Sequence, residues 1–239
     1  MKQKKDNQED NSDLSPKVLK PMREKIPKGL IAVFVIFFIL LIDQISKIWV
    51  KTNMALYDSI EITKWFKIYF VENNGMAFGI EAIGKLFLSI FRIIAVGFIG
   101  VYLAKVIRKD YKFGFIICIS MVLAGAFGNI IDSVFYGEIF SASYPGHVAH
   151  FVPIGEGYSS WLHGKVVDML YFPLIETTLP NWIPIWGGIE ILFFRFIFNL
   201  ADASISVGVT LLLLFYRKTL SHSLQTEKEK QKAINEMNG

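Results

Sequence analysis

Apolar runs long enough to cross a membrane alternate with polar segments along the chain. Every residue from Leu30 to Ile42 is apolar, and a helix over residues 30–50 would be about 31 Å long, enough to cross a bilayer. Further apolar runs predict spans at about 83–107, 113–134 and 196–216. The first run could be a cleavable signal peptide, but charged residues follow it where a small-residue cleavage site would be expected. We therefore interpret it as a retained span.

The two longest connections between these spans have different patterns. Residues 51–82 alternate polar with apolar positions and contain a turn-like Asn-Asn-Gly, which predicts short strands outside the membrane. Residues 135–195 contain prolines, glycines and several tryptophans, which predicts a long connection on the membrane surface. The expected fold class is a mainly α membrane protein, a four-helix transmembrane bundle with a small extracytoplasmic β-rich segment and a long outer loop. This domain covers residues 30–216, between polar tails at 1–29 and 217–239.

Composition and charge agree with a membrane protein. Hydrophobic residues make up 53% of the chain and charged residues only 19%, which is unusual for a soluble domain. The net charge is +4, with lysines and arginines gathered in both tails and in a short loop at 108–112, so the charge indicates membrane orientation and no nucleic-acid partner. The bias predicts that both termini face the cytoplasm. The single cysteine, Cys118, has no partner for an internal disulfide and is expected to be buried.

Polar residues inside the predicted spans fall at one membrane surface. An aspartate at a helix centre costs about 2.5–3.5 kcal/mol on insertion scales, so several facing lipid would be heavily penalised. With both termini inside, each of the helical pairs lies at the outer end of its span, and the spacing places the two members of a pair on one helix face. We therefore expect one inward-facing polar site at the outer surface. The pairs are Asp43 with Lys47, Asn129 with Asp132, and Asn199 with Asp202; Asn73 and Asp168 lie in the outer segments.

Two aspartates suggest a chemistry for this site. Asp168 ends the sequence "GKVVD" and Asp202 ends "FNLAD", each beside an apolar run. If the two carboxyl groups are close, repulsion keeps one protonated as an acid while the other acts as a base, which allows peptide hydrolysis without a metal or cofactor. The alternative is that Asp168 is an ordinary loop carboxylate and Asp202 a helix residue bonded to its neighbours. His147 and His150 lack further ligands, so no metal site is expected.

Two other functions are compatible with buried carboxylates. A proton-coupled transporter also needs them, but transporters usually place them near the midplane and often contain internal repeats, which we do not find here. A non-catalytic scaffold would use polar residues only to hold helices together. It gives no reason for an aspartate in the outer "GKVVD" segment.

Five short motifs in order resemble those of the lipoprotein signal peptidases, also called signal peptidase II. The motifs are "DQISK" from Asp43, "NNGMAF" from Asn73, "AGAFGNIID" ending at Asp132, "GKVVD" and "FNLAD". The resemblance implies an aspartic endopeptidase of the bacterial inner membrane, with its active site at the periplasmic face. Its substrate would be a diacylglyceryl-modified prolipoprotein, cut before the lipidated cysteine. We expect membrane lipids as neighbours and a monomer.

The resemblance also implies roles for individual residues. Asp168 and Asp202 match the catalytic aspartates of the family. Asn73, Asn129 and Asn199 match positions that line the site and contact substrate. Positions with a supporting role are Asp43, Lys47, Gly75, Asp132 and Ala201.

The chain departs from the family pattern in two places. The family usually has an arginine after the aspartate of the third motif, where it contacts the substrate backbone, and this chain has Ser133. Lys165 and Arg195 are candidates to replace it, but their spacing favours neither. The interval from Asp132 to Asp168 is also longer than is usual in the family.

Overall fold

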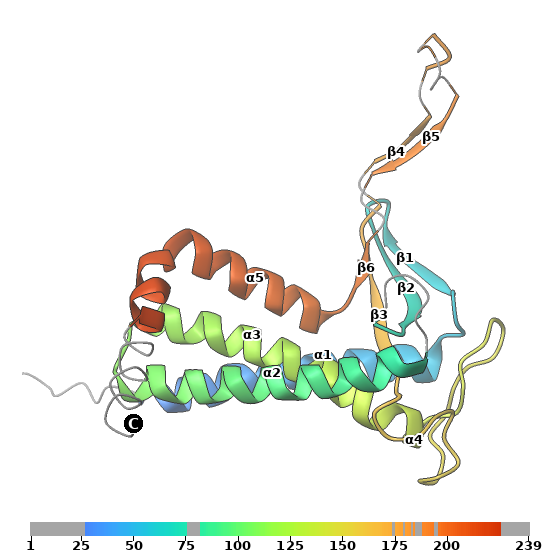
Figure 1. Ribbon diagram of the computed structural model, residues 1–239. Coiled ribbons are helices and arrows are strands. Elements are labelled where there is room, and N and C mark those ends of the chain that lie inside the picture. The colour runs from blue at the N-terminus through green and yellow to red at the C-terminus, as the bar shows by residue number, and fades with distance from the viewer. Residues whose placement is uncertain are drawn as a thin grey trace, which may run out of the picture.

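Four helices lie side by side in an elongated bundle with a β-sheet at one end (Figure 1). The computed structural model describes residues 27–75, 82–173, 175–178, 180–182, 184, 188–193 and 196–225. The bundle consists of α1 (Lys28–Asn53), α2 (Ala82–Arg108), α3 (Phe113–Ile131) and α5 (Leu200–Phe215). A π-helical turn, η1 (Asp132–Tyr136), and the short α4 (Gly137–Ile139) continue α3.

The bundle has the properties of a membrane domain. Three helices, Lys28–Asn53, Gly84–Arg108 and Phe113–Ile139, are long and apolar enough to cross a membrane, and α5 gives a fourth span if its bent continuation Arg217–Gln225 is counted with it. Large apolar side chains point outward from several helices: Phe37 is 62% exposed, Phe98 72% and Leu214 69%. Such an apolar exterior requires lipid as its solvent. The predicted mainly α membrane fold is confirmed.

The sheet joins segments from distant parts of the sequence. Its antiparallel order is β1 (Ser59–Thr63), β2 (Phe66–Asn73), β3 (Val166–Tyr171) and β6 (Ile197–Phe198). The strands expected within 51–82 are present as β1 and β2. A separate hairpin, β4 (Ile175–Thr178) with β5 (Glu190–Phe193), projects away from the bundle (Figure 1).

Two features of the sheet differ from our expectation. Asp168 lies on β3, opposite Val71 of β2, and not in a loop. The first four residues of β3 are all buried, so the sequence lacks the alternation that identifies a strand with one exposed face. The fourth helix begins at Leu200 and not at residue 196, because β6 precedes it and Asn199 forms its N-cap.

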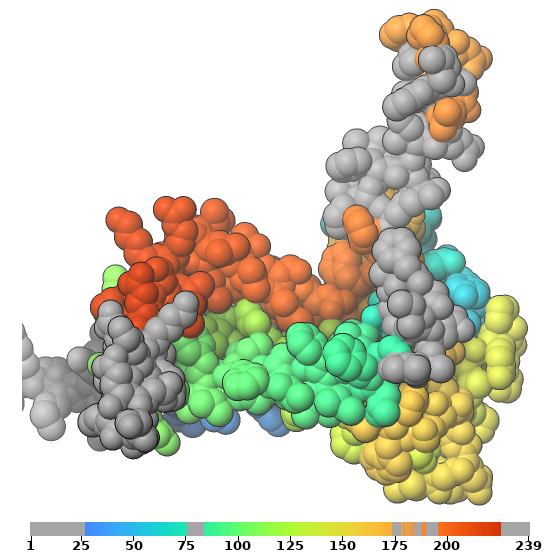
Figure 2. Space-filling view, viewed as in Figure 1, coloured from blue at the N-terminus to red at the C-terminus, as the bar shows by residue number. Residues whose placement is uncertain are grey.

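The connection over residues 140–165 covers the sheet end of α3 and forms the yellow lobe in Figure 2. The wider π-turn leaves carbonyl groups free for this segment. The backbone N–H of Gly164 donates to the Ser133 carbonyl over 2.9 Å, and that of Leu162 donates to the Val134 carbonyl over 3.3 Å. These bonds attach the residues before β3 to the end of α3, which fixes the position of Asp168.

Two buried apolar clusters hold the structure together. One lies within the bundle and includes Phe115 and Cys118, which confirms that the cysteine is buried. The other joins helices to sheet: Val50 of α1 and Tyr136 of η1 pack with Phe70 of β2 and other residues of the sheet. The second cluster keeps the sheet in a fixed relation to the helix ends.

Small residues let α3 approach its neighbours closely, as the sequence predicted. A Cβ atom on Gly125 would overlap the carbonyl oxygen of Ala201 in α5. A Cβ on Gly128 would lie 2.7 Å from the Asp43 Oδ2 atom in α1. The backbones of α3 and α5 can therefore not keep this distance with larger residues.

We expect Gly125→Ala to lower the free energy of unfolding by about 1–3 kcal/mol, because the added methyl group forces α3 and α5 apart. The measurement is thermal or denaturant unfolding in detergent micelles. Gly97→Ala is the matched control, since a Cβ on Gly97 of α2 would meet nothing within 4 Å. Equal stability of the two variants would contradict the close packing described here.

Candidate active site

The site contains a buried charged group, in which the fully buried Lys47 lies between two aspartates. Lys47 of α1 lies 2.9 Å from Asp43 Oδ2, one turn earlier in the same helix, and 2.9 Å from Asp132 Oδ2 in η1. All three side chains have no exposed surface. The predicted pairing of Asp43 with Lys47 is confirmed. A buried charge of either sign needs such partners, because desolvation costs several kcal/mol per ion.

Hydrogen bonds connect this charged group to the other helices. Gln44 donates to Asp132 Oδ1 over 3.0 Å and to the Gly128 carbonyl over 3.2 Å, and it accepts from the Tyr136 hydroxyl over 3.1 Å. The backbone N–H of Ala201 donates to Asp43 Oδ1 over 2.9 Å. Asp43 therefore connects α1 to the first turn of α5.

Asp168 lies on β3, outside this charged group. Its Oδ1 accepts a 2.7 Å hydrogen bond from the Asn199 amide, and its Oδ2 accepts a 3.1 Å bond from the Asn73 amide. The Asn73 oxygen in turn accepts from the backbone N–H of Gly75 over 2.7 Å. Gly75 has φ of 71°, a conformation that favours glycine. The motif around Asn73 thus shapes a turn whose side chain reaches the aspartate.

Asp202 reaches the same place from α5. Its Oδ1 accepts a 2.7 Å bond from the Asn129 amide of α3, and its backbone N–H donates to Asn199 Oδ1 over 2.9 Å. The two asparagines are themselves bonded, Asn199 Nδ2 to Asn129 Oδ1, over 3.2 Å. Asp168 and Asp202 are therefore linked through a pair of bonded amide groups. The three helical pairs, Asn73 and Asp168 therefore converge on this region.

The surroundings perturb Asp168. Burial raises the pKa of its carboxyl group to about 6, and the negative charge of Asp202 acts in the same direction. Asp168 is 3% exposed, so water screens this repulsion weakly. Within the described residues, no three histidine, cysteine, aspartate or glutamate side chains are grouped so that they could hold a metal ion.

A cation that we did not select from the sequence lies beside Ser133. The Nη1 atom of Arg92, in α2, donates to Ser133 Oγ over 3.2 Å. An ionisable residue in the middle of an apolar span is itself a signal of a functional site, and this signal was available at position 92. Lys165, one of the two candidates, pairs instead with Glu72 over 3.0 Å. Arg195, the other, lies outside the described residues.

A second buried charge cluster joins the sheet to the 140–165 segment. Glu72 of β2 accepts from Lys51 of α1 and from Ser143, and it pairs with Lys165. Burial opposes ionisation of Glu72, but the two lysines outweigh it and lower the pKa of the carboxyl group. The ammonium of Lys51 also lies 4.9 Å from the centre of the Tyr158 ring, within cation–π range.

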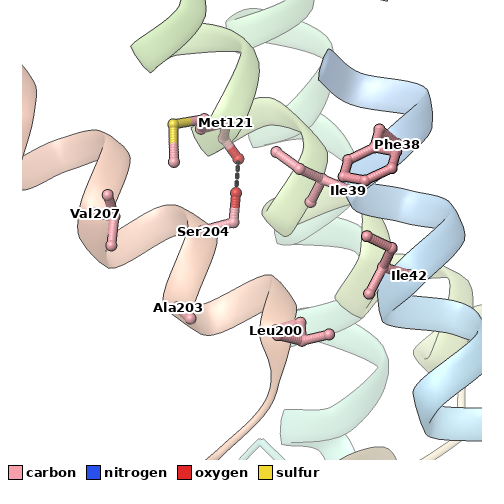
Figure 3. Close-up of a pocket in the computed structure, with 8 residues that line it drawn as sticks. All are labelled: Phe38, Ile39, Ile42, Met121, Leu200, Ala203, Ser204 and Val207. Atoms are coloured by element: carbon pink, nitrogen blue, oxygen red, sulfur yellow. Dashed lines mark hydrogen bonds between the residues drawn. The ribbon is translucent and has the colours of Figure 1, made fainter. Parts of the chain in front are cut away.

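Two apolar clefts lie on the elements that carry the site. One, of about 250 Å³, is lined by residues of α1, α3 and α5 (Figure 3). Ser204, one of its lining residues, uses its hydroxyl to bond the Met121 carbonyl over 2.8 Å, so the cleft presents almost no free polar group. A second cleft, of about 350 Å³, lies between α1, β2 and β3. Ile42 lines both clefts, one residue before Asp43.

Comparison with known proteins identifies the family. The family described as "Signal peptidase (SPase) II" matches residues 35–217. The chain belongs to the signal peptidase II family. A lipoprotein signal peptidase of Porphyromonas gingivalis is 52% identical over 205 residues, which cover 85% of this chain and 90% of that protein. The lipoprotein signal peptidase of Amoebophilus asiaticus is 37% identical over 191 residues, 77% of this chain and 76% of that protein.

A solved structure supports the same fold for this signal peptidase II family member. A bacterial membrane enzyme determined by the in meso method at 2.3 Å superposes with a TM-score of 0.52 and 26% sequence identity. The match covers 80% of this chain and 90% of that chain. Family membership makes this chain a membrane protease. It therefore excludes the transporter and the scaffold as readings of the buried carboxylates.

We expect Lys47→Met to destabilise the protein by about 3–5 kcal/mol, because it leaves Asp43 and Asp132 buried without a counter-charge. The measurement is unfolding in detergent micelles at neutral pH. Lys64→Met, in the exposed turn between β1 and β2, is the control. A Lys47→Met protein as stable as the control would show that Lys47 does not hold the two aspartates in place.

Proposed function

We propose that this protein is an intramembrane aspartic endopeptidase that removes the signal peptide from diacylglyceryl-modified prolipoproteins, cutting before the lipidated cysteine. The observation that carries the proposal is the link between Asp168 and Asp202 through the amides of Asn199 and Asn129. Amide donors hold both carboxyl groups without adding charge. The repulsion that favours one shared proton therefore remains.

The surroundings suggest which aspartate carries the proton. Asp202 lies in the first turn of α5, where the helix dipole favours an ionised carboxylate. Asp168, with its raised pKa, holds a proton more readily and is therefore assigned as the general acid. In this assignment Asp202 takes a proton from water as the water attacks the scissile carbonyl carbon. Asp168 donates its proton to the carbonyl oxygen, and the pair then delivers a proton to the leaving amine.

The three asparagines divide the remaining work in this proposal. Asn73 is exposed and uses one amide hydrogen for Asp168, so the other is available to the substrate backbone. Asn129 and Asn199 are buried and line the site by holding the carboxyl groups. The other selected residues have a supporting role in the site. They are Asp43, Lys47, Gly75, Asp132 and Ala201.

The apolar clefts suggest how the substrate lies. Its signal segment and acyl chains would remain in the lipid-facing part of the bundle, beside the clefts that meet at Ile42. The scissile bond would then reach the carboxylates at the sheet end. The lysines and arginines at 108–112 lie at the opposite end, which supports cytoplasmic termini, a periplasmic active site and insertion in the bacterial inner membrane. We treat the protein as a monomer, since this arrangement needs no second copy.

We expect Asp168→Asn and Asp202→Asn each to reduce cleavage of a diacylglyceryl precursor by at least about 10³-fold, because each removes a positioned proton transfer. The measurement is conversion of purified precursor with the protein in detergent micelles and a metal chelator present. Both variants are expected to insert in the membrane in normal amounts.

Glu156→Gln, in an exposed position of the 140–165 segment, is the control for removal of a carboxylate. The same precursor without its diacylglyceryl group should remain uncut by the wild-type protein. Cleavage by either asparagine variant at the wild-type rate would refute the dyad. Equal cleavage of both precursors would refute the substrate class.

The pH dependence follows from the raised pKa of Asp168. As pH rises above about 6, Asp168 loses the proton it must donate, so kcat/KM is expected to fall. A bound substrate excludes more water, which deepens the burial that raises the pKa. The alkaline limb of kcat should therefore lie at higher pH than that of kcat/KM. A kcat/KM that stays constant between about pH 5 and pH 8 would contradict the assignment of Asp168 as the acid.

A further inference from the structure

The site contains a cation with donors to spare. Lys47 has three N–H groups, and they face Asp43, Asp132 and Asn129 at 2.9, 2.9 and 3.0 Å. It can offer a substrate nothing more. Arg92 has five N–H donors, and within the described part of the chain it uses one hydrogen bond, to Ser133.

Arg92 lies close to the charged residues of the site. Its partner Ser133 directly follows Asp132, whose carboxyl group pairs with Lys47. The guanidinium makes no ion pair with any carboxylate of the described residues within 4 Å. Arg92 therefore keeps donors that a substrate backbone could use.

The other side of the guanidinium meets the turn after β2. A Cβ atom on Gly75 would lie 3.0 Å from Arg92 Nη2, so the guanidinium passes directly beside this glycine. Arg92 thus lies between the Gly75 turn, which carries Asn73, and Ser133 of η1. Both of these neighbours belong to the walls of the site.

The negative charge of the site also favours a cation at position 92. Two carboxyl groups share Lys47, and the proposed dyad adds a negative charge when it holds one proton. Arg92 supplies a compensating positive charge at the rim. A guanidinium also suits peptide carbonyls, because its planar fork can bond two acceptors at once.

We propose that Arg92 of α2 binds main-chain carbonyl oxygens of the substrate beside the scissile bond, and so does from α2 what Ser133 cannot do from η1. The inference rests on the proposed function, because it assumes that a peptide bond lies against Asp168 and Asp202. Arg92 is a substrate-binding residue in this assignment. Ser133 only steadies the guanidinium.

Binding and turnover test this role separately. In an Asp168→Asn background, which binds without cutting, adding Arg92→Met is expected to weaken binding of the diacylglyceryl precursor about 10- to 100-fold. Binding is measured by fluorescence anisotropy of a labelled precursor in detergent micelles. In the active protein, Arg92→Met should raise KM by a similar factor, and Arg92→Lys, which keeps the charge but loses the fork, should fall between wild type and Arg92→Met.

The controls separate substrate binding from a structural role. Arg108→Met removes an exposed cation from the last turn of the same helix and should change neither binding nor KM. Ser133→Ala removes the partner of Arg92 and should change KM by less than about threefold. If Ser133→Ala weakened binding as much as Arg92→Met, or if Arg92→Met bound normally, the proposal would be overturned.

Folding and the parent proposal can be checked independently. Unfolding temperatures of the Arg92 variants show whether the fold is intact, and Arg92→Lys covers the case in which Arg92→Met does not fold. Wild-type protein that bound the precursor but did not cut it would refute the peptidase proposal. The binding comparison would still decide the role of Arg92.

Discussion

The orientation of the whole site depends on one buried ammonium group. Lys47 can only donate, so the Asn129 atom that faces it at 3.0 Å must be the amide oxygen. The Asn129 NH₂ group is thereby directed to Asp202, at 2.7 Å. The Asn129 oxygen also accepts from Asn199, whose own oxygen caps α5. The Asn199 NH₂ group also donates a hydrogen bond to Asp168. A single charge therefore sets the polarity of the two asparagines, Asn129 and Asn199, that link the carboxyl groups.

Some of this arrangement was readable from the sequence because it depends on helical spacing. Asp43 and Lys47 are one turn apart in a helix, and the pairing follows from that alone. The membrane fold followed equally from the length of the apolar runs, because a single apolar run of this length satisfies its own backbone in lipid as a helix. The small residues near the end of α3 correctly indicated close helix contact, since no other feature explains a glycine at 125.

Other parts depend on tertiary contacts that leave no local pattern. β3 is buried along most of its length, so its residues do not alternate, and its place in the sheet is set by pairing with β2 from a distant segment. The π-turn at Asp132–Tyr136 exists together with the bonds that its carbonyls accept from Gly164 and Leu162. The sequence of the turn does not predict these hydrogen bonds, and the sequence around Gly164 and Leu162 does not predict the turn. Arg92 differs, because its charge in an apolar helix was a signal that we did not use.

The long segment over 140–165 has a defined structural role. The buried Glu72 of β2 contacts Lys51 of α1, Ser143 and Lys165. One carboxylate therefore connects both ends of the segment to the helix and the sheet. Lys165 lies three residues before Asp168. Because breaking a buried ion pair is costly, the cluster restricts where β3 can begin. The added length of the segment therefore helps to fix β3, and with it the carboxyl group of Asp168.

The separation of charged and neutral partners explains how such a site can keep a proton. An ammonium in direct contact with Asp168 or Asp202 would favour ionisation of both carboxyl groups and remove the acid from the proposed dyad. Lys47 instead contacts Asp43 and Asp132, and within the described residues the side chains that bond the other two carboxyl groups are asparagine amides. The amides fix geometry without supplying charge. The repulsion from Asp202 then adds to burial in raising the pKa of Asp168, as the proposed dyad requires.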